Sequence, residues 1–122
     1  MAKILIVDDD ETDRVGLASI LEQAGHTVLL AGDGNEALET FFAERVHLVV
    51  TDMVMPGRDG LGLISALREV DPGAPIIAIS GKSPGQLEAS KVFGARVVLT
   101  KPIDREEFLA AVEGIVGAGE RA

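Results

Sequence analysis

The sequence contains no cysteine, so disulfide bonds and thiolate metal sites are excluded. It also lacks any apolar run close to the roughly 18 residues that a membrane-spanning helix needs. The chain starts with an apolar stretch too short for a signal peptide, and no small-residue cleavage site follows it. We therefore expect a cytoplasmic protein with no membrane partner.

Positive charge is also scarce, because 11 lysines and arginines face 20 aspartates and glutamates, for a net charge of −9. Such a balance repels phosphate backbones, so direct nucleic-acid binding is not expected. The acidity on its own is compatible with a role in solubility alone. However, Asp8, Asp9 and Asp10 stand together after an apolar run, where a merely solvated acidic face would not place them.

The chain has 122 residues, which suits one compact domain with a core large enough to need no disulfide or structural metal. Short apolar runs alternate with segments whose apolar residues recur with the helical period. The predicted strands are residues 3–7, 27–30, 47–51, 75–79 and 96–100. Each is followed by a predicted helix, of which the fourth, about residues 84–93, has the least regular apolar face.

This alternation predicts a single (βα)5 domain of the α/β class, a doubly wound parallel sheet covered on both faces. Gly25 and Gly94 follow the first and fourth predicted helices, at the position that favours a left-handed backbone. We expect the domain to occupy residues 1–117 and residues 118–122 to form a frayed tail, because nothing in them can be buried.

Polar side chains follow four of the predicted strands. Asp8 and Asp9 follow the first strand, Asp52 the third, Ser80 the fourth and Lys101 the fifth. Ligands of open parallel sheets bind outside the carboxyl ends of the strands, where the strand order reverses. The pattern therefore brings three carboxylates, a hydroxyl and an ammonium to one edge.

This set of groups restricts the chemistry. Carboxylates about 4 Å apart repel by roughly 4 kcal/mol per pair, and one lysine cannot neutralise three of them. An oxygen-only site with room for water suits Mg²⁺, and a carboxylate beside that ion can attack phosphorus. Taken singly, Asp8 to Asp10 are more typical of a helix cap, and Asp52 is as typical of a turn as of a site. The prediction rests on their joint placement.

The sequence resembles a response-regulator receiver domain of two-component signalling along essentially its whole length. The resemblance is carried by the acid pair, by Asp-x-x-Met-Pro-x-x-Asp-Gly starting at Asp52, and by Lys101-Pro102, in the stretches 4–10, 49–60, 75–81 and 99–103. It implies a flavodoxin-like strand order 2-1-3-4-5 and a cis bond before Pro102.

By this resemblance Asp52 is the phosphoacceptor and Mg²⁺ is held by Asp8, Asp9, Asp52 and the backbone carbonyl of Val54. Ser80 and Lys101 would contact the phosphoryl group. The donor would be a phosphohistidine on a sensor histidine kinase or phosphotransfer protein. The receiver would not be an enzyme in the usual sense, but would catalyse its own phosphorylation and dephosphorylation and change its surface near the fourth helix and fifth strand.

The sequence departs from the family pattern at Val98, where relatives commonly have Tyr or Phe. An inward-turning aromatic ring cannot operate here, so we expect a weaker output, or one carried by the backbone of residues 80–83 and the fourth helix. Val54 and Lys82 occupy positions that tune dephosphorylation in relatives. An apolar Val54 offers water no hydrogen bond, which predicts slow self-hydrolysis.

Two other functions compete with this interpretation. Gly32-Asp33-Gly34-Asn35-Glu36-Ala37 fits a dinucleotide-binding fingerprint, but that fingerprint belongs after the first strand and here follows the second. A metal-dependent phosphatase that uses Asp52 as nucleophile usually has a general acid two residues later, where Val54 cannot transfer a proton.

Some properties stay open at this stage. His26 and His47 lie at the starts of strands, opposite the predicted site, and we expect both at the surface. The sequence does not show the kinase, the downstream target or whether a phosphorylation-dependent dimer forms. The domain either acts alone or is the receiver module of a longer regulator.

Overall fold

The computed structural model describes residues 2–53, 60–81 and 94–121 of the chain. Five strands and four helices lie within this part of the chain. The strands are β1 Lys3–Val7, β2 Thr27–Ala31, β3 Leu48–Asp52, β4 Ile76–Ser80 and β5 Val97–Thr100. The helices are α1 Glu11–Gln23, α2 Gly34–Ala43, α3 Gly60–Val70 and α5 Arg105–Arg121. The predicted fourth helix, residues 84–93, lies outside the described residues.

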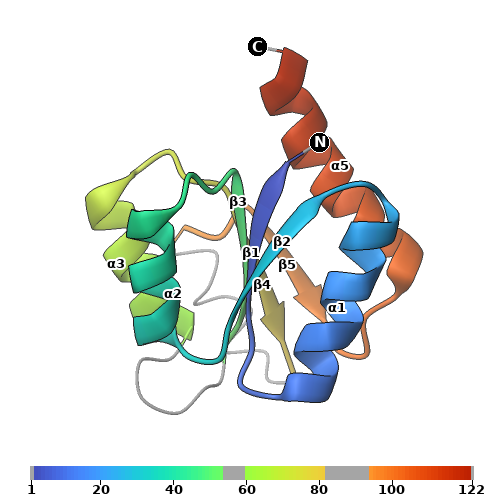
Figure 1. Cartoon of the computed structure of the whole chain (residues 1–122), viewed down its shortest axis with the longest axis horizontal. Coiled ribbons are helices and arrows are strands. Elements are labelled where there is room, and N and C mark those ends of the chain that lie inside the picture. The colour runs from blue at the N-terminus through green and yellow to red at the C-terminus, as the bar shows by residue number, and fades with distance from the viewer. Residues whose placement is uncertain (1, 54–59, 82–93, 122) are drawn as a thin grey trace.

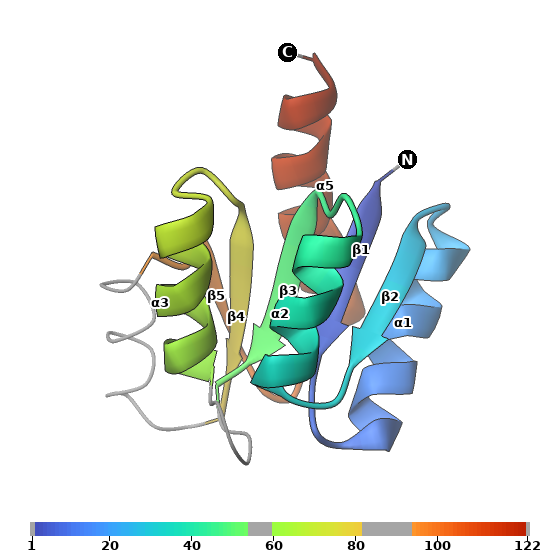
Figure 2. The ribbon, with the colours of Figure 1, turned by 60° about the vertical axis from the view of Figure 1, so that its left-hand side comes forward.

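All five strands are parallel and form one sheet in the order β2-β1-β3-β4-β5 (Figure 2). The predicted α/β class and strand order are therefore confirmed. The order reverses between β1 and β3, since the chain leaves β1 for β2 on one side and returns to β3 on the other. Ligands of such sheets bind beside this point, at the carboxyl ends of the strands.

Side chains of successive strand residues enter two separate apolar cores, one on each face of the sheet. In β1, Ile4 and Ile6 join the core that contains Phe108 of α5, whereas Leu5 and Val7 join the other core. Figure 1 shows α1 and α5 on one side of the sheet and α2 and α3 on the opposite side. The continuous apolar runs of the strands therefore follow from burial on both faces.

The local signals for helix ends agree with the structure. Asp10 and Asp33 are the N-caps of α1 and α2, and their carboxylates accept from the backbone N–H groups of Asp13 and Glu36. Gly25 has a positive φ of 94°, as the end of α1 requires. These signals fix where the loops at both ends of the sheet begin.

Helix α5 continues to Arg121, through residues that we expected to form a frayed tail. The last apolar residues that it buries in the described core are Ile115 and Val116. Continuation beyond them needs no buried face, because each added residue gains one backbone hydrogen bond once a helix has formed.

The prediction that His26 lies at the surface is wrong. Its side chain is buried, with 8% of the residue exposed, and its Nδ1 accepts from the backbone N–H of Ala2 at 3.2 Å. Its Nε2 lies 2.7 Å from a carboxylate oxygen of Glu113 on α5. His47 is exposed, as predicted, and its Nδ1 accepts from the N–H of Lys3 at 2.9 Å.

Two further features narrow the range of functions that the structure allows. No helix within the described ranges is long and apolar enough to cross a bilayer. The glycine-rich motif beginning at Gly32 connects β2 to α2, and β2 is the edge strand of the sheet. This motif therefore lies away from the point where the strand order reverses, which disfavours the dinucleotide-binding alternative.

Candidate functional site

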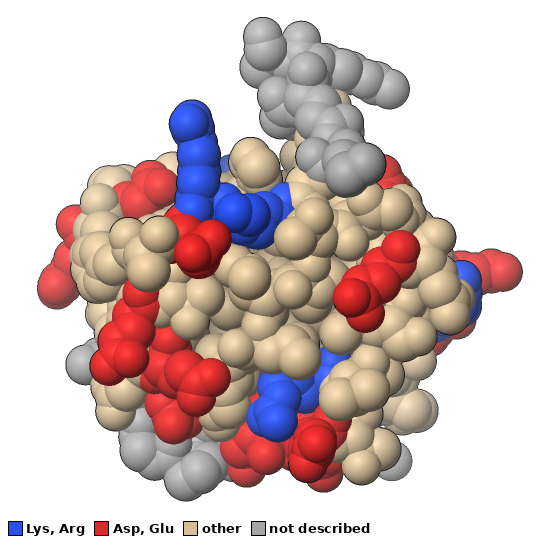
Figure 3. Space-filling view, in the orientation of Figure 1, with Lys and Arg blue, Asp and Glu red and all other residues tan. Residues whose placement is uncertain are grey.

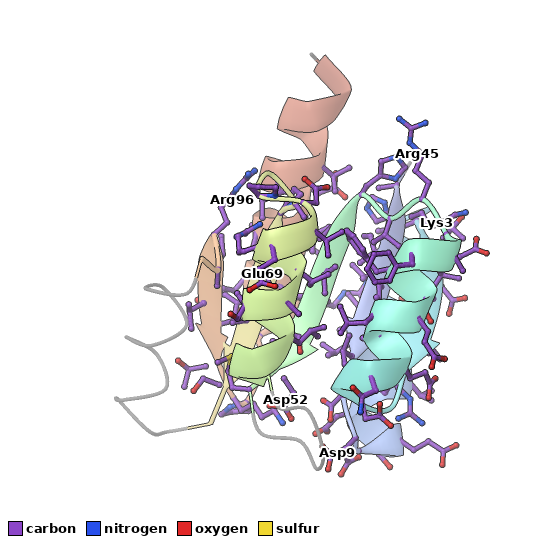
Figure 4. All side chains as sticks on the ribbon, turned by 90° about the vertical axis from the view of Figure 1, so that its left-hand side faces the viewer. Lys3, Asp9, Arg45, Asp52, Glu69 and Arg96 are labelled. Atoms are coloured by element: carbon purple, nitrogen blue, oxygen red, sulfur yellow. The ribbon has the colours of Figure 1, made fainter. Side chains whose placement is uncertain are left out.

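The carboxyl ends of the strands bring the predicted site residues to one edge of the sheet. Asp52 and Ser80 are the last residues of β3 and β4, while Asp8 and Lys101 directly follow β1 and β5. The N–H of Asp8 donates to Ala31 of β2 at 3.1 Å, and the N–H of Lys101 donates to the carbonyl of Ser80 at 2.8 Å. In Figure 4, Asp9 and Asp52 lie at this end of the molecule, whereas Lys3, Arg45 and Arg96 lie at the other.

Three carboxylates converge at this edge. One oxygen each from Asp8, Asp9 and Asp52 lies within 4.8 Å of the others. Asp8 and Asp52 are buried, with 1% and 7% of each residue exposed, whereas Asp9 is exposed. Buried carboxylates this close together repel strongly, so the cluster favours a cation. Hard oxygen donors with one side open to water match the preference of Mg²⁺.

Asp8 is oriented by the backbone around it. Its Oδ1 accepts from the N–H of Asp10 at 2.9 Å, and its carbonyl accepts from the guanidinium of Arg14 at 2.7 Å. The pKa of Asp8 is raised to about 6, mainly by burial and also by the negative charge of Asp52, while the hydrogen bond from Asp10 opposes the shift. A bound cation would offset both causes of the raised pKa, the burial of the Asp8 carboxylate and its repulsion by Asp52.

Lys101 supplies positive charge to the cluster. Its Nζ donates to Oδ2 of Asp52 at 3.1 Å and lies 3.5 Å from Oδ2 of Asp13. Burial disfavours the ammonium, but the hydrogen bond to Asp52 and the charges of Asp52, Asp8 and Asp13 outweigh it. Together they raise the pKa of Lys101 above its ordinary value. Lys101 is therefore a firmly protonated cation, held against the carboxylate of Asp52.

The remaining predicted residues differ in what the structure reports of them. Ser80 is fully buried at the end of β4, opposite Thr100 of β5. The bond between Lys101 and Pro102 is cis, as the resemblance implied. Val98 is partly buried and packs against the core on the α2 and α3 side. Val54 and Lys82 lie outside the described residues.

Two residues of α1 that the sequence analysis missed belong to this site. Asp13 shares the ammonium of Lys101, and Arg14 binds the backbone of Asp8. A signal was available, because Asp13 follows the capping residue Asp10 by three positions. Its backbone is thereby fixed in the first helical turn, beside the strand ends.

The site opens into a cavity of about 550 Å³ between the start of α1 and the loop that follows β5. Carboxylates of Asp8 and Asp13 and the Lys101 ammonium line one part of it, and Leu17 and Ile103 line an apolar part. Figure 3 shows acidic side chains gathered around basic ones at the lower end of the visible face, where α1 begins in Figure 1. The arrangement suits a small anionic group that arrives with its own counter-cation.

Comparison with known protein families matches residues 4–113 to the response regulator receiver domain. The chain is 36% identical to the protein PilH of Pseudomonas aeruginosa, covering 95% of this chain and 98% of PilH. It is 34% identical to YesN of Bacillus subtilis, an uncharacterized transcriptional regulatory protein, covering 99% of this chain but only 34% of YesN.

Solved structures agree with these sequence relatives. The chemotaxis protein CheY4 of Vibrio cholerae superposes with a TM-score of 0.87 at 31% identity, covering 94% of this chain and 98% of that chain. The backbone geometry, and not only the sequence pattern, is therefore shared with CheY4.

Proposed function

Because the chain belongs to the response regulator receiver domain family, we propose that Asp52 reversibly accepts a phosphoryl group, which switches the protein between two signalling states. One observation carries the proposal. The buried carboxylate of Asp52 lies in a cluster with Asp8 and Asp9 and 3.1 Å from the Lys101 ammonium. A carboxylate whose role was only to stabilise a turn would need neither the neighbouring carboxylates nor the paired lysine.

The donor set fits Mg²⁺, which would be held by Asp8, Asp9 and Asp52, with the backbone carbonyl of Val54 as a further ligand. Such an ion would neutralise oxygens of the transferring phosphoryl group. The Val54 contribution rests on the family resemblance, since this residue lies outside the described part of the chain. The fit itself rests on three converging carboxylates that a single lysine does not neutralise.

In the transfer, a carboxylate oxygen of Asp52 attacks phosphorus while the bond from phosphorus to a donor histidine nitrogen breaks. An aspartyl phosphate forms, and the imidazole leaves with the electron pair of that bond and takes up a proton. Lys101 can then turn its ammonium from Oδ2 of Asp52 to a phosphoryl oxygen, since its Nζ lies within hydrogen-bond reach of that carboxylate. Ser80 provides a hydroxyl at the end of the neighbouring strand.

The donor that we propose is a phosphohistidine of a sensor histidine kinase or phosphotransfer protein, and the receiver supplies most of the catalysis of both transfer and hydrolysis. The apolar Val54 gives attacking water no hydrogen-bond partner, so self-hydrolysis is slow. A Val54→Asn variant that loses its phosphoryl group no faster than the wild type contradicts this part of the proposal.

In this proposal, phosphorylation changes the backbone after β4 and strand β5, and this change carries the signal to the target. Val98 pairs with Ala78 of β4 and cannot act as a turning aromatic ring.

The relatives include a protein of about the length of this chain and a much longer one, since the chain spans nearly all of PilH but about a third of YesN. We therefore propose a receiver that acts either alone or as a module of a longer regulator, through a protein target.

Intact-mass measurement tests the central claim. The protein is incubated with acetyl phosphate and Mg²⁺, with Asp52→Asn as the matched variant and a sample with chelator as control. The proposal expects one phosphoryl adduct on the wild type, little adduct without metal, and none on the variant. An adduct of equal yield on Asp52→Asn would place the phosphoryl group elsewhere and overturn it.

A further inference from the structure

Lys101 is bound by two carboxylates from two different elements. Its Nζ lies 3.1 Å from Asp52 of β3 and 3.5 Å from Asp13 of α1. The contact with Asp52 satisfies hydrogen-bond geometry, and the contact with Asp13 is a slightly longer ion pair. The side chain of Asp52 is 9% exposed and that of Asp13 is 48% exposed. The ammonium therefore stands between the nucleophile and an acid at the mouth of the site.

The position of Asp13 is built into the start of α1. Its backbone N–H donates to the Oδ1 of the capping residue Asp10 at 3.0 Å, which fixes Asp13 in the first helical turn. Asp13 and Lys101 both line the cavity beside the site. Asp13 does not belong to the cluster of Asp8, Asp9 and Asp52, so its carboxylate is not among the predicted metal ligands.

We propose that Asp13 is a positioning residue that shares the Lys101 ammonium with Asp52 and so limits how freely this ammonium reaches the phosphoryl group. The inference rests on the proposed function, because it concerns the cation that meets the phosphoryl group. Asp13 competes with the nucleophile for the ammonium before transfer, and with the phosphoryl oxygens afterwards. It thereby lowers the rate at which Asp52 is phosphorylated and leaves the rate dependent on ionic strength.

The physical argument concerns charge. During transfer from an acyl phosphate, negative charge accumulates beside Asp52, and a freely available ammonium lowers the energy of that state. An acid that pairs with this ammonium reduces its effect and adds repulsion of its own. A partly exposed ion pair is weak, so its removal is expected to change a rate by about twofold to fivefold.

Three variants isolate the pair. Asp13→Asn removes the charge at nearly constant shape, and Asp13→Glu restores it on a longer side chain. Glu11→Gln removes one charge from the same helical turn at an exposed residue, whereas the described ion pairs of Lys101 involve Asp13 and Asp52. This matched control measures the effect of net charge alone.

The first measurement is the NMR signals of the Lys101 methylene group next to Nζ in the unphosphorylated protein. Asp13→Asn is expected to shift these signals, Asp13→Glu to shift them less, and Glu11→Gln to leave them unchanged. Wild-type signals in Asp13→Asn, or an equal shift in Glu11→Gln, would overturn the proposal. This measurement needs no phosphorylation, so it decides on Asp13 even if Asp52 of the wild type takes no phosphoryl group.

The second measurement is the initial rate of phosphorylation by acetyl phosphate with Mg²⁺ in excess, at low and at high salt. Asp13→Asn is expected to react about two to five times faster than the wild type at low salt, with the gain lost at high salt. Glu11→Gln is expected to gain less. An Asp13→Asn rate equal to or below that of the wild type would overturn the proposal, and so would a gain matched by Glu11→Gln.

Discussion

Asp8 is negatively charged and buried, and this combination has a cost in the metal-free protein. Burial raises its pKa from 3.8 to about 6, and the charge of Asp52 contributes in the same direction. Between about pH 4 and pH 6 the folded protein retains a proton that the unfolded chain has released. The free energy of unfolding therefore falls as the pH rises through this window, by up to about 3 kcal/mol.

Replacing Asp8 with Asn is therefore expected to stabilise the metal-free protein. The amide keeps an acceptor for the N–H of Asp10 and removes the buried charge. Urea unfolding in a chelator, followed by circular dichroism, should show a gain of about 2 kcal/mol near pH 8 and almost none near pH 4. Glu22→Gln on exposed α1 surface is the charge-matched control. A gain that is the same at both pH values would contradict the assignment of the penalty to Asp8.

His26 illustrates a polar residue that stabilises the fold away from the site. Its Nδ1 satisfies the N–H of Ala2, which is itself buried. We predict that His26→Leu lowers the free energy of unfolding by about 1–3 kcal/mol, because this N–H loses its acceptor. His26→Asn, whose Oδ1 can replace Nδ1, should recover part of the loss in the same urea titration. Equal losses for the two variants would show that the acceptor is unimportant.

At the scale of elements, Arg68 joins α3 to the segments around it. Its guanidinium donates at 2.5 Å to the carbonyls of Ala74, before β4, and Gly94, before β5. Gly94 has a φ of 116°, and a Cβ there would lie 2.5 Å from Nε of Arg68. The glycine is therefore required for its backbone conformation and for the space that the arginine occupies.

This arrangement predicts different costs for alanine substitutions at the two described glycines of positive φ. Gly25→Ala strains a positive φ but meets no neighbouring atom, so it should cost about 1–2 kcal/mol. Gly94→Ala must in addition displace Arg68 and its two carbonyl contacts, so it should cost at least about 1 kcal/mol more. Chemical unfolding of the two variants side by side measures the difference. An equal loss would show that Arg68 moves aside freely.

At the scale of the whole molecule, metal binding is expected to couple stability to pH. A ligand at about 100 times its dissociation constant adds about 2.7 kcal/mol to the free energy of unfolding. Mg²⁺ requires the ionised form of Asp8, whose pKa is about 6. Mg²⁺ should therefore raise the Tm clearly near pH 8 and only weakly near pH 5. Asp8→Asn should lose most of the effect, and an undiminished rise in that variant would contradict the proposed ligand set.

Sequence reasoning predicted the parts of the fold that depend on the local pattern of apolar and polar residues. The parallel sheet follows from apolar runs such as residues 48–50, which are buried on both faces. The proximity of Asp52 and Lys101 could be predicted from the sequence, because parallel strands place their carboxyl ends at one edge and the family motif marks both positions.

The errors and omissions involve partners that are distant in sequence. His26 looked like a surface residue because its partner Glu113 lies 87 residues away on α5. Asp13 was overlooked because its pairing with Lys101 joins a helix start to a loop after the last strand, and the capping pattern around Asp10 places its backbone but not this partner.

The start of β1 and the end of α5 lie at the same end of the molecule, and Asp9 and Asp52 of the carboxylate cluster lie at the other (Figures 1 and 4). A tether attached after α5 would therefore present the phosphorylation edge outward, towards the solution. For a biosensor surface or a single-molecule handle, this polarity means that immobilisation and donor access do not compete. The direction of the parallel strands thus determines which end of the molecule can be attached to a surface while the phosphorylation site stays accessible.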